Sequence, residues 1–212
     1  MIKKIKQFIT SADTSKDEKE KKIIVLDPSQ LGGPPEPDLR IVGLFSDVLE
    51  DKVADLVHAL LYLDEINRLS ESEKQQPIKF YISTYGGSAD DMFALYDVIR
   101  QLRETSELHT IGLGKVMSAG VLLLAAGTKG KRKIGKNCRV MIHSVMGGNH
   151  GSLHNMMNEM EAIEQLQEMY CDCLVEETKL SRSKLKKMIE RKVNVYLTAE
   201  EAVELGIADI II

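Results

Sequence analysis

From Arg40 to the carboxyl terminus, the chain alternates between short β-type runs and longer runs with helical hydrophobic spacing. Runs rich in β-branched and aromatic residues predict strands, and apolar residues three or four positions apart predict helices. The expected strands are Ile41–Leu44, Ile78–Ser83, Leu108–Leu113, Lys133–Ile134, Arg139–Ile142, Val195–Leu197 and Ile210–Ile212. Strands that alternate with helices in this way predict an α/β fold with a largely parallel sheet.

The expected helices lie between these strands. They cover Val48–Leu69, Met92–Leu102, Val116–Ala126, Ser152–Glu177, Ser183–Arg191 and a last helix after Thr198. The Val116–Ala126 segment is apolar on nearly every side, which predicts a buried helix. Thr198, with Glu201 three positions later, is typical of a capping box at the start of the last helix.

The first 38 residues have a different character from the rest of the 212-residue chain. A charged stretch runs from Ser11 to Lys22, and Gly32–Pro37 contains prolines that interrupt regular structure. We expect residues 1–38 to form an amino-terminal arm and Pro-rich linker, and residues 39–212 to form one folded domain. Met1–Ile9 lacks the continuous apolar stretch of a secretory signal. A functional arm and a cleavable or disordered tail are both open interpretations.

The composition argues against several classes of protein. With 28 basic and 32 acidic residues the net charge is −4, which argues against a protein built to bind nucleic acid. No apolar run approaches the roughly 18 residues needed to span a membrane. Three cysteines without paired spacing do not form a disulfide framework, so we expect a reducing compartment and a cytoplasmic location.

A glycine pair follows the expected strand Ile78–Ser83. In Thr84–Ser88, Gly86 and Gly87 would let the main chain approach a ligand closely and direct N–H groups toward it. The alternative is a simple turn that requires positive φ angles.

Ser118 begins a segment too apolar to be exposed. It could be the N-cap of the expected buried helix. It could also be a nucleophile, because Ala119 and Gly120 leave room for a substrate and a helix amino terminus stabilises a developing oxyanion. A serine nucleophile needs a base, since its hydroxyl reacts slowly at neutral pH.

His143 is the candidate base, because it directly follows the strand Arg139–Ile142 and would be held rigidly there. A structural histidine is the alternative at this position. His150 and His154 have the i, i+4 spacing of metal ligands but lack an intervening glutamate and a third ligand. We therefore predict no metal site.

Taken together, several sequence blocks resemble the Clp protease proteolytic subunit family (ClpP), serine peptidases with a crotonase-like fold. The resemblance covers roughly residues 40–210. The blocks that carry it are Tyr81–Gly87, Ser118–Gly120 with Leu122–Gly127, Gly130–Arg132, Asn137–His143, and Leu197–Ala202 with Gly206 and Asp209. Their shared order along the chain is far more specific than any one block.

The resemblance implies a role for each candidate residue. Ser118 would be the nucleophile and His143 the general base, and the backbone N–H groups of Gly87 and Ala119 would form the oxyanion hole. The expected helix from Ser152 to Glu177 has an apolar stripe of Met156, Met160, Ile163, Leu166, Tyr170 and Leu174. The resemblance implies that this helix is the protruding handle that joins two stacked heptameric rings, with its methionine-rich stripe as an adaptable interface. Packing within the domain core could explain the same stripe.

The resemblance also implies the substrate and the partners. Unfolded polypeptides would be cut inside the chamber of a homo-oligomer, with no cofactor bound by this chain. A ring-shaped AAA+ unfoldase that uses ATP would be the partner of such a particle. The family contacts it through short axial loops, which the arm of this chain does not closely match.

Asn194 stands where the family has its catalytic aspartate. A neutral amide stabilises an imidazolium less than a carboxylate does, and in a chymotrypsin-like triad the Asp-to-Asn change costs about 10⁴-fold in kcat. We therefore expect a working but attenuated peptidase with Ser118, His143 and Asn194 as its catalytic residues. The alternatives are a weakly active or structural subunit of a mixed ring, and an acyl-CoA enzyme of the crotonase-like fold.

Overall fold

The computed structural model describes residues 39–70, 76–148, 150–190 and 194–212. Leu39–Ile212 form one compact unit. The expected arm of residues 1–38 lies outside the described residues, as does Arg191, the predicted end of one helix. No helix in the described part of the chain combines the length and the apolar character that a membrane crossing requires.

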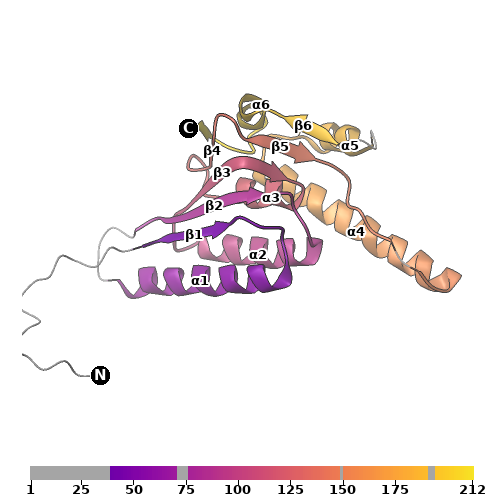
Figure 1. Cartoon of the computed structure of the whole chain (residues 1–212), viewed down its shortest axis with the longest axis horizontal. Helices are drawn as coiled ribbons and strands as arrows, with labels where there is room; N and C mark the ends of the chain where they lie inside the picture. Colours follow the sequence, from indigo (N-terminus) through magenta and orange to yellow (C-terminus); the bar gives the residue numbers. More distant parts are fainter. Residues whose placement is uncertain (1–38, 71–75, 149, 191–193) are drawn as a thin grey trace, which may run out of the picture. The chain divides into compact units, whose positions relative to one another are not determined.

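The described part has the expected alternation of strands and helices (Figure 1). In chain order the elements are β1 (Ile41–Leu44), α1 (Glu50–Leu69), β2 (Ile78–Thr84), α2 (Ala89–Leu102), β3 (Leu108–Met117), α3 (Ala119–Ala125), β4 (Lys133–Ile134), β5 (Arg139–Ile142), α4 (Leu153–Glu177), α5 (Arg182–Glu190), β6 (Val195–Leu197), α6 (Ala199–Glu204) and β7 (Ile210–Ile211). Thr198 and Glu201 form the predicted capping box of α6.

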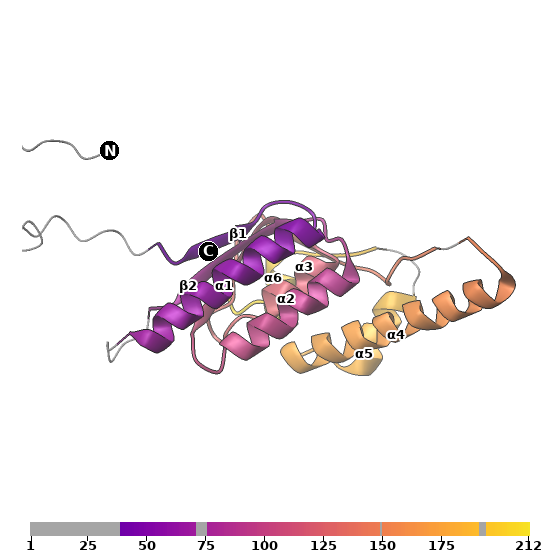
Figure 2. The same ribbon diagram turned by 90° about the horizontal axis from the view of Figure 1, so that it is seen from below.

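One sheet joins all seven of these strands. Its order is β1-β2-β3-β4-β7, with every pair on this path parallel. Strand β5 pairs in parallel with β3 and antiparallel with β6. Helices α1 and α2 lie side by side against one face of the sheet (Figures 1 and 2). The predicted α/β class with a largely parallel sheet is confirmed.

The central strand β3 is longer than predicted. We expected a helix from Val116, but Lys115–Met117 pair with Arg139–Met141 and are therefore strand. Helix α3 consequently begins at Ala119, and each of its seven residues is buried, as its composition predicted. The shift leaves Ser118 as the single residue between the end of β3 and the start of α3.

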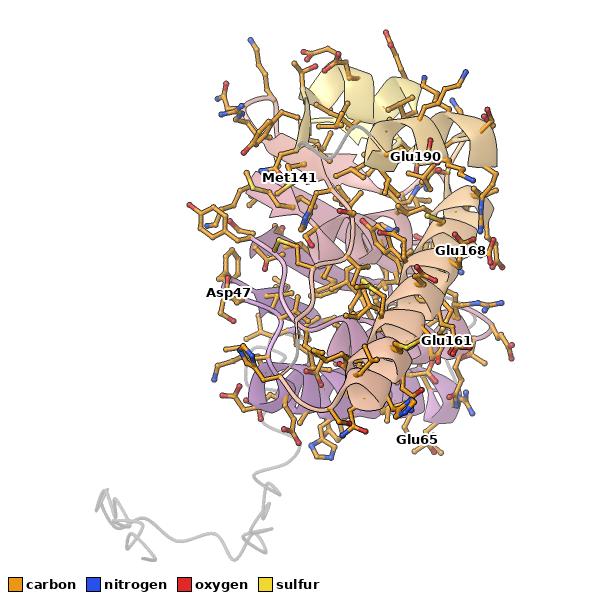
Figure 3. All side chains as sticks on the ribbon, turned by 90° about the vertical axis from the view of Figure 1, so that its right-hand side faces the viewer. Asp47, Glu65, Met141, Glu161, Glu168 and Glu190 are labelled. Carbon is orange, nitrogen blue, oxygen red and sulfur yellow. The ribbon has the colours of Figure 1, made fainter. Side chains whose placement is uncertain are left out.

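Helix α4 has two different halves. Its carboxyl-terminal part packs into the core through residues such as Tyr170 and Leu174. Its amino-terminal half extends away from the layers and exposes the large side chains of Leu153, Met156 and Met160 (Figures 1 and 2). Figure 3 looks onto this helix, with Glu161 and Glu168 along its length. The carboxyl-terminal end of the predicted apolar stripe therefore lies in the core, whereas its amino-terminal end is exposed.

Candidate active site

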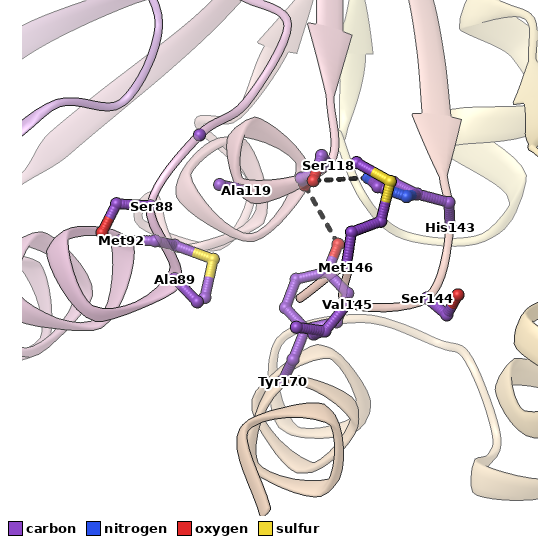
Figure 4. Close-up of a pocket in the computed structure, with 11 residues that line it drawn as sticks. Ser88, Ala89, Met92, Ser118, Ala119, His143, Ser144, Val145, Met146 and Tyr170 are labelled. Carbon is purple, nitrogen blue, oxygen red and sulfur yellow. Dashed lines mark hydrogen bonds between the residues drawn. The ribbon is translucent and has the colours of Figure 1, made fainter. Parts of the chain in front are cut away.

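Ser118 and His143 meet at one edge of the sheet. The serine directly follows β3 and the histidine directly follows β5, and these strands are parallel neighbours. Because the carboxyl ends of adjacent parallel strands lie at the same edge, the two side chains come together. His143 Nε2 lies 2.7 Å from Ser118 Oγ, a hydrogen-bond distance (Figure 4).

The backbone of Ser118 is strained. Its φ of 53° and ψ of −121° make it the one non-glycine residue with positive φ in the part of the chain described. Such conformations cost roughly 1–3 kcal/mol and cluster at functional sites. Ser118 occupies the N-cap position of α3, but its side chain makes no capping hydrogen bond. The strained backbone instead aims the hydroxyl at His143.

The surroundings of His143 favour the neutral imidazole. Burial lowers the pKa of this side chain below its ordinary value, because a charged ring is poorly solvated there. Within the described residues, the hydrogen bond of the imidazole is to Ser118 and not to a carboxylate. A neutral ring at pH 7 can accept a proton, as a general base must.

Close contacts leave no room for a side chain at Gly86 or Gly87, so these glycines do more than form a turn. Gly86 has φ of 106°, and a Cβ there would lie 2.6 Å from Ser118 Cβ. Gly87 has φ of 150°, and a Cβ there would lie 2.3 Å from the carbonyl oxygen of Val48. No side chain fits at either position, so the loop backbone runs directly against the serine and against Val48.

Two backbone N–H groups near the serine make no hydrogen bond within the described residues. Val48 N donates to Gly86 O, and Ser88 N donates to Val48 O, but Gly87 N is left out of this pairing. Over the ranges that the structure covers, neither Gly87 N nor Ala119 N makes a hydrogen bond. Both residues line the same pocket as Ser118 and His143. These N–H groups are therefore available to an oxyanion.

The pocket has a volume of about 180 Å³. Ser118, Ala119 and His143 line it, and Met92, Val145 and Met146 add apolar surface (Figure 4). Met146 is 80% exposed, so the pocket opens to solvent beside this side chain. A short peptide side chain fits such a space.

Asn194 directly precedes β6, and His143 directly follows β5. The last residue pair of the antiparallel β5–β6 ladder is Ile142 and Val195, so both residues lie just beyond the same end of this strand pair. Asn194 is exposed, and among the described residues no hydrogen bond joins it to His143.

Two contacts of α4 with the site were missed in the sequence. The Tyr170 hydroxyl donates to the carbonyl oxygen of Ser118 at 3.0 Å (Figure 4). The Gln167 side-chain oxygen accepts from Val145 N at 2.7 Å, two residues beyond His143. We placed Tyr170 in an apolar stripe. A hydroxyl within such a stripe requires a partner, which is the signal that could have identified it.

The remaining candidates do not add to the site. Across the described ranges, no group of three or more histidine, cysteine, aspartate or glutamate side chains is arranged to hold a metal ion. His150 precedes α4 and His154 lies in its first turn, and neither is among the residues that line the pocket.

Comparison with known proteins identifies similar chains. The family model described as Clp protease matches residues 38–212. An ATP-dependent Clp protease proteolytic subunit 3 from Synechococcus sp. (strain CC9605) is 36% identical over 174 residues, which are 82% of each chain. An ATP-dependent Clp protease proteolytic subunit 1 from Prochlorococcus marinus subsp. pastoris is 31% identical over 173 residues, 82% of this chain and 83% of the relative.

Proposed function

Because this chain belongs to the Clp protease family and has its ClpP/crotonase-like fold, we propose that it is a serine endopeptidase that cleaves unfolded polypeptides. Membership of the Clp protease family supports a ClpP-type peptidase. The observation that supports the serine mechanism is the 2.7 Å contact between Ser118 Oγ and His143 Nε2 at a pocket with two unpaired N–H groups.

The proposed reaction proceeds through an acyl-enzyme. His143 Nε2 accepts the hydroxyl proton as Ser118 Oγ attacks the scissile carbonyl carbon. The N–H groups of Gly87 and Ala119 then donate to the carbonyl oxygen as it becomes an oxyanion. His143 returns the proton to the departing amine, and the C–N bond breaks. Water hydrolyses the Ser118 ester by the same steps, which restores the serine.

Asn194 would complete this site as a weaker version of the usual third residue. We expect its side-chain carbonyl to accept the Nδ1–H of His143 after a rotation, since the two residues lie just beyond the last pair of the β5–β6 ladder. The amide carries no charge, so it would orient the ring without stabilising the imidazolium as a carboxylate does. We infer an attenuated peptidase.

The exposed half of α4 supports the assembly part of the proposal. Its large apolar side chains, including Met156, Met157 and Met160, are 42%, 60% and 60% exposed. We propose that this face joins two stacked heptameric rings into a chamber in the cytoplasm. An AAA+ unfoldase would feed substrates to it at the expense of ATP, and this chain would bind no cofactor itself.

A second candidate is a weakly active or structural subunit of a mixed ring. The state of Asn194 favours this candidate, because the residue is exposed and, among the described residues, makes no hydrogen bond to His143. The two candidates differ in whether the purified chain cleaves peptides on its own.

Hydrolysis of a fluorogenic peptide by the purified chain tests the proposal. Wild type and a Ser83→Ala control should cleave it, because Ser83 lies outside the pocket, whereas Ser118→Ala should not. Light scattering on the same samples should show a large ring particle, and Met160→Glu should shift it toward smaller species. An assembled wild-type particle without activity would favour the structural subunit. A stable wild-type monomer would contradict the chamber.

A further inference from the structure

Tyr170 reaches the active site from a helix that carries none of the expected catalytic residues. Its side chain is 4% exposed, and its hydroxyl donates to Ser118 O at 3.0 Å. Burial raises the pKa of this phenol well above its ordinary value, so the hydroxyl keeps its proton and can donate across the working pH range.

The acceptor of this hydrogen bond, Ser118 O, belongs to the Ser118–Ala119 peptide. The carbonyl of Ser118 and the N–H of Ala119 are the two polar ends of one planar group, and in a trans peptide they point in opposite directions. Whatever fixes the Ser118 oxygen therefore also fixes the direction of the Ala119 N–H. Ala119 lines the pocket, and its N–H makes no hydrogen bond within the described residues.

Two donors hold the oxygen end of this peptide. Val121 N donates to Ser118 O at 3.0 Å from within α3, and the Tyr170 hydroxyl donates from α4. Hydrogen bonds in a chain polarise one another, so donation to the carbonyl also makes the N–H at the other end a better donor. This peptide follows Ser118, whose φ of 53° is unfavourable for a residue with a side chain, so a second donor would help to hold its orientation.

We propose that Tyr170 is a positioning residue for the oxyanion hole, acting through the Ser118–Ala119 peptide. It lines the same pocket as Ser118 and His143, but its hydroxyl donates to the Ser118 carbonyl oxygen and not to the reacting Ser118 Oγ. It holds the Ala119 N–H in the direction that a developing oxyanion requires, and it links α4 directly to the chemistry. This inference rests on the proposed function, since it assumes that Ser118 forms a tetrahedral adduct.

The test compares Tyr170→Phe with a matched variant that loses a buried tyrosine hydroxyl elsewhere. Phenylalanine retains the ring that packs in the core. Tyr96→Phe is the control, because the Tyr96 hydroxyl is buried and donates to Glu177 instead of to the site. Both variants are measured for kcat and KM on a fluorogenic peptide. They are also measured for inhibition by a peptide aldehyde, which forms a hemiacetal oxyanion with the serine.

Tyr170→Phe should lower kcat by about fivefold, the effect of one neutral hydrogen bond, and leave KM unchanged. The inhibition constant of the aldehyde should rise by about the same factor, whereas binding of the corresponding unreactive peptide alcohol should not change. The effect should stay below the roughly 100-fold loss that removal of an oxyanion donor causes, since Ala119 N–H remains. Tyr96→Phe should leave all three measurements as in wild type.

Two results would overturn the inference while leaving the proposed function in place. One is a Tyr170→Phe protein with wild-type kcat and aldehyde inhibition. The other is an equal loss in Tyr96→Phe, which would mean that the effect is one of general stability. A wild-type protein that neither cleaves the peptide nor binds the aldehyde would overturn the proposed function and, with it, this role of Tyr170.

Discussion

Replacing Asn194 by aspartate should raise peptidase activity. The β5–β6 ladder ends at the Ile142–Val195 pair, so residue 194 and His143 lie just beyond the same end of these strands, and we expect a carboxylate there to lie near the imidazole. A carboxylate favours the charged ring that forms as His143 takes the proton of Ser118. The present environment does the opposite, because burial lowers the pKa of His143 with no compensating charge.

The size of the gain follows from the separation and the exposure. Opposite unit charges about 5 Å apart attract by about 3 kcal/mol at a dielectric constant of 20 and by about 0.8 kcal/mol in bulk water. Asn194 is exposed, so the lower part of this range applies. About 1.4 kcal/mol of extra transition-state stabilisation corresponds to a rise of about tenfold in kcat.

The pH dependence of kcat/KM shows in which direction the substitution shifts the pKa of His143. In wild type the lowered pKa of His143 keeps the base neutral into the acid range, so the acid limb lies below the ordinary imidazole value of about 6.5. In Asn194→Asp the carboxylate raises the pKa of His143, so the acid limb should move to higher pH while the plateau rises.

The assay is hydrolysis of a fluorogenic peptide by Asn194→Asp, wild type and Asn158→Asp. Asn158 lies on the exposed part of α4, so its variant adds the same charge away from the site. Asn158→Asp should behave as wild type. An Asn194→Asp activity equal to or below that of wild type would refute the claim that Asn194 limits the rate.

Two further changes test other parts of the structure. Gly87→Ala should lower kcat by about 100-fold, because a Cβ there would lie 2.3 Å from Val48 O and would displace the proposed oxyanion donor. Gly130→Ala is the control: Gly130 also has positive φ, but a Cβ there would meet no atom, so this variant should affect only stability. Glu177→Gln should lower the melting temperature, because it removes a carboxylate that Arg103 and Lys129 stabilise. Burial alone would raise the pKa of Glu177, but the hydrogen bonds from these two residues outweigh burial and lower this pKa. This stabilisation is present above the ordinary carboxyl pKa and lost as pH falls through the folded value. Wild-type melting temperatures that do not fall in acid more than those of Glu177→Gln would contradict it.

Much of the fold could be predicted because local pattern and tertiary structure agree. The predicted strands β1, β4, β5 and β6 have their observed bounds. Helix α3 was placed too early because Val116 and Met117 are as apolar as the helix that follows. Only their pairing with β5 distinguishes strand from helix there.

The site was predictable in its residue types but not in its connections. His143 and Gly87 follow predicted strands, and Ser118 and Ala119 follow β3 as observed, although the predicted helix from Val116 contained them. All four residues line one pocket at the carboxyl ends of these strands. The antiparallel pairing that puts Asn194 and His143 just beyond the same end of two strands depends on β6, which is far along the chain.

The role of α4 could not be predicted for a similar reason. A helical period identifies which residues share a face, but not which other segment that face contacts. Tyr170 and Leu174 share the predicted stripe with Met156 and Met160, yet the first pair is buried and the second is exposed. The hydrogen bond from Tyr170 to Ser118 spans 52 positions of sequence and is visible only in three dimensions.

Covalent labelling with a fluorophosphonate, followed by peptide mass mapping, tests the central claim most directly. The account predicts that wild type is modified at Ser118 and that His143→Ala loses this modification, because the imidazole 2.7 Å away removes the hydroxyl proton. Labelling of Ser118 at an unchanged rate in His143→Ala, or stable labelling of a different serine in wild type, would contradict it.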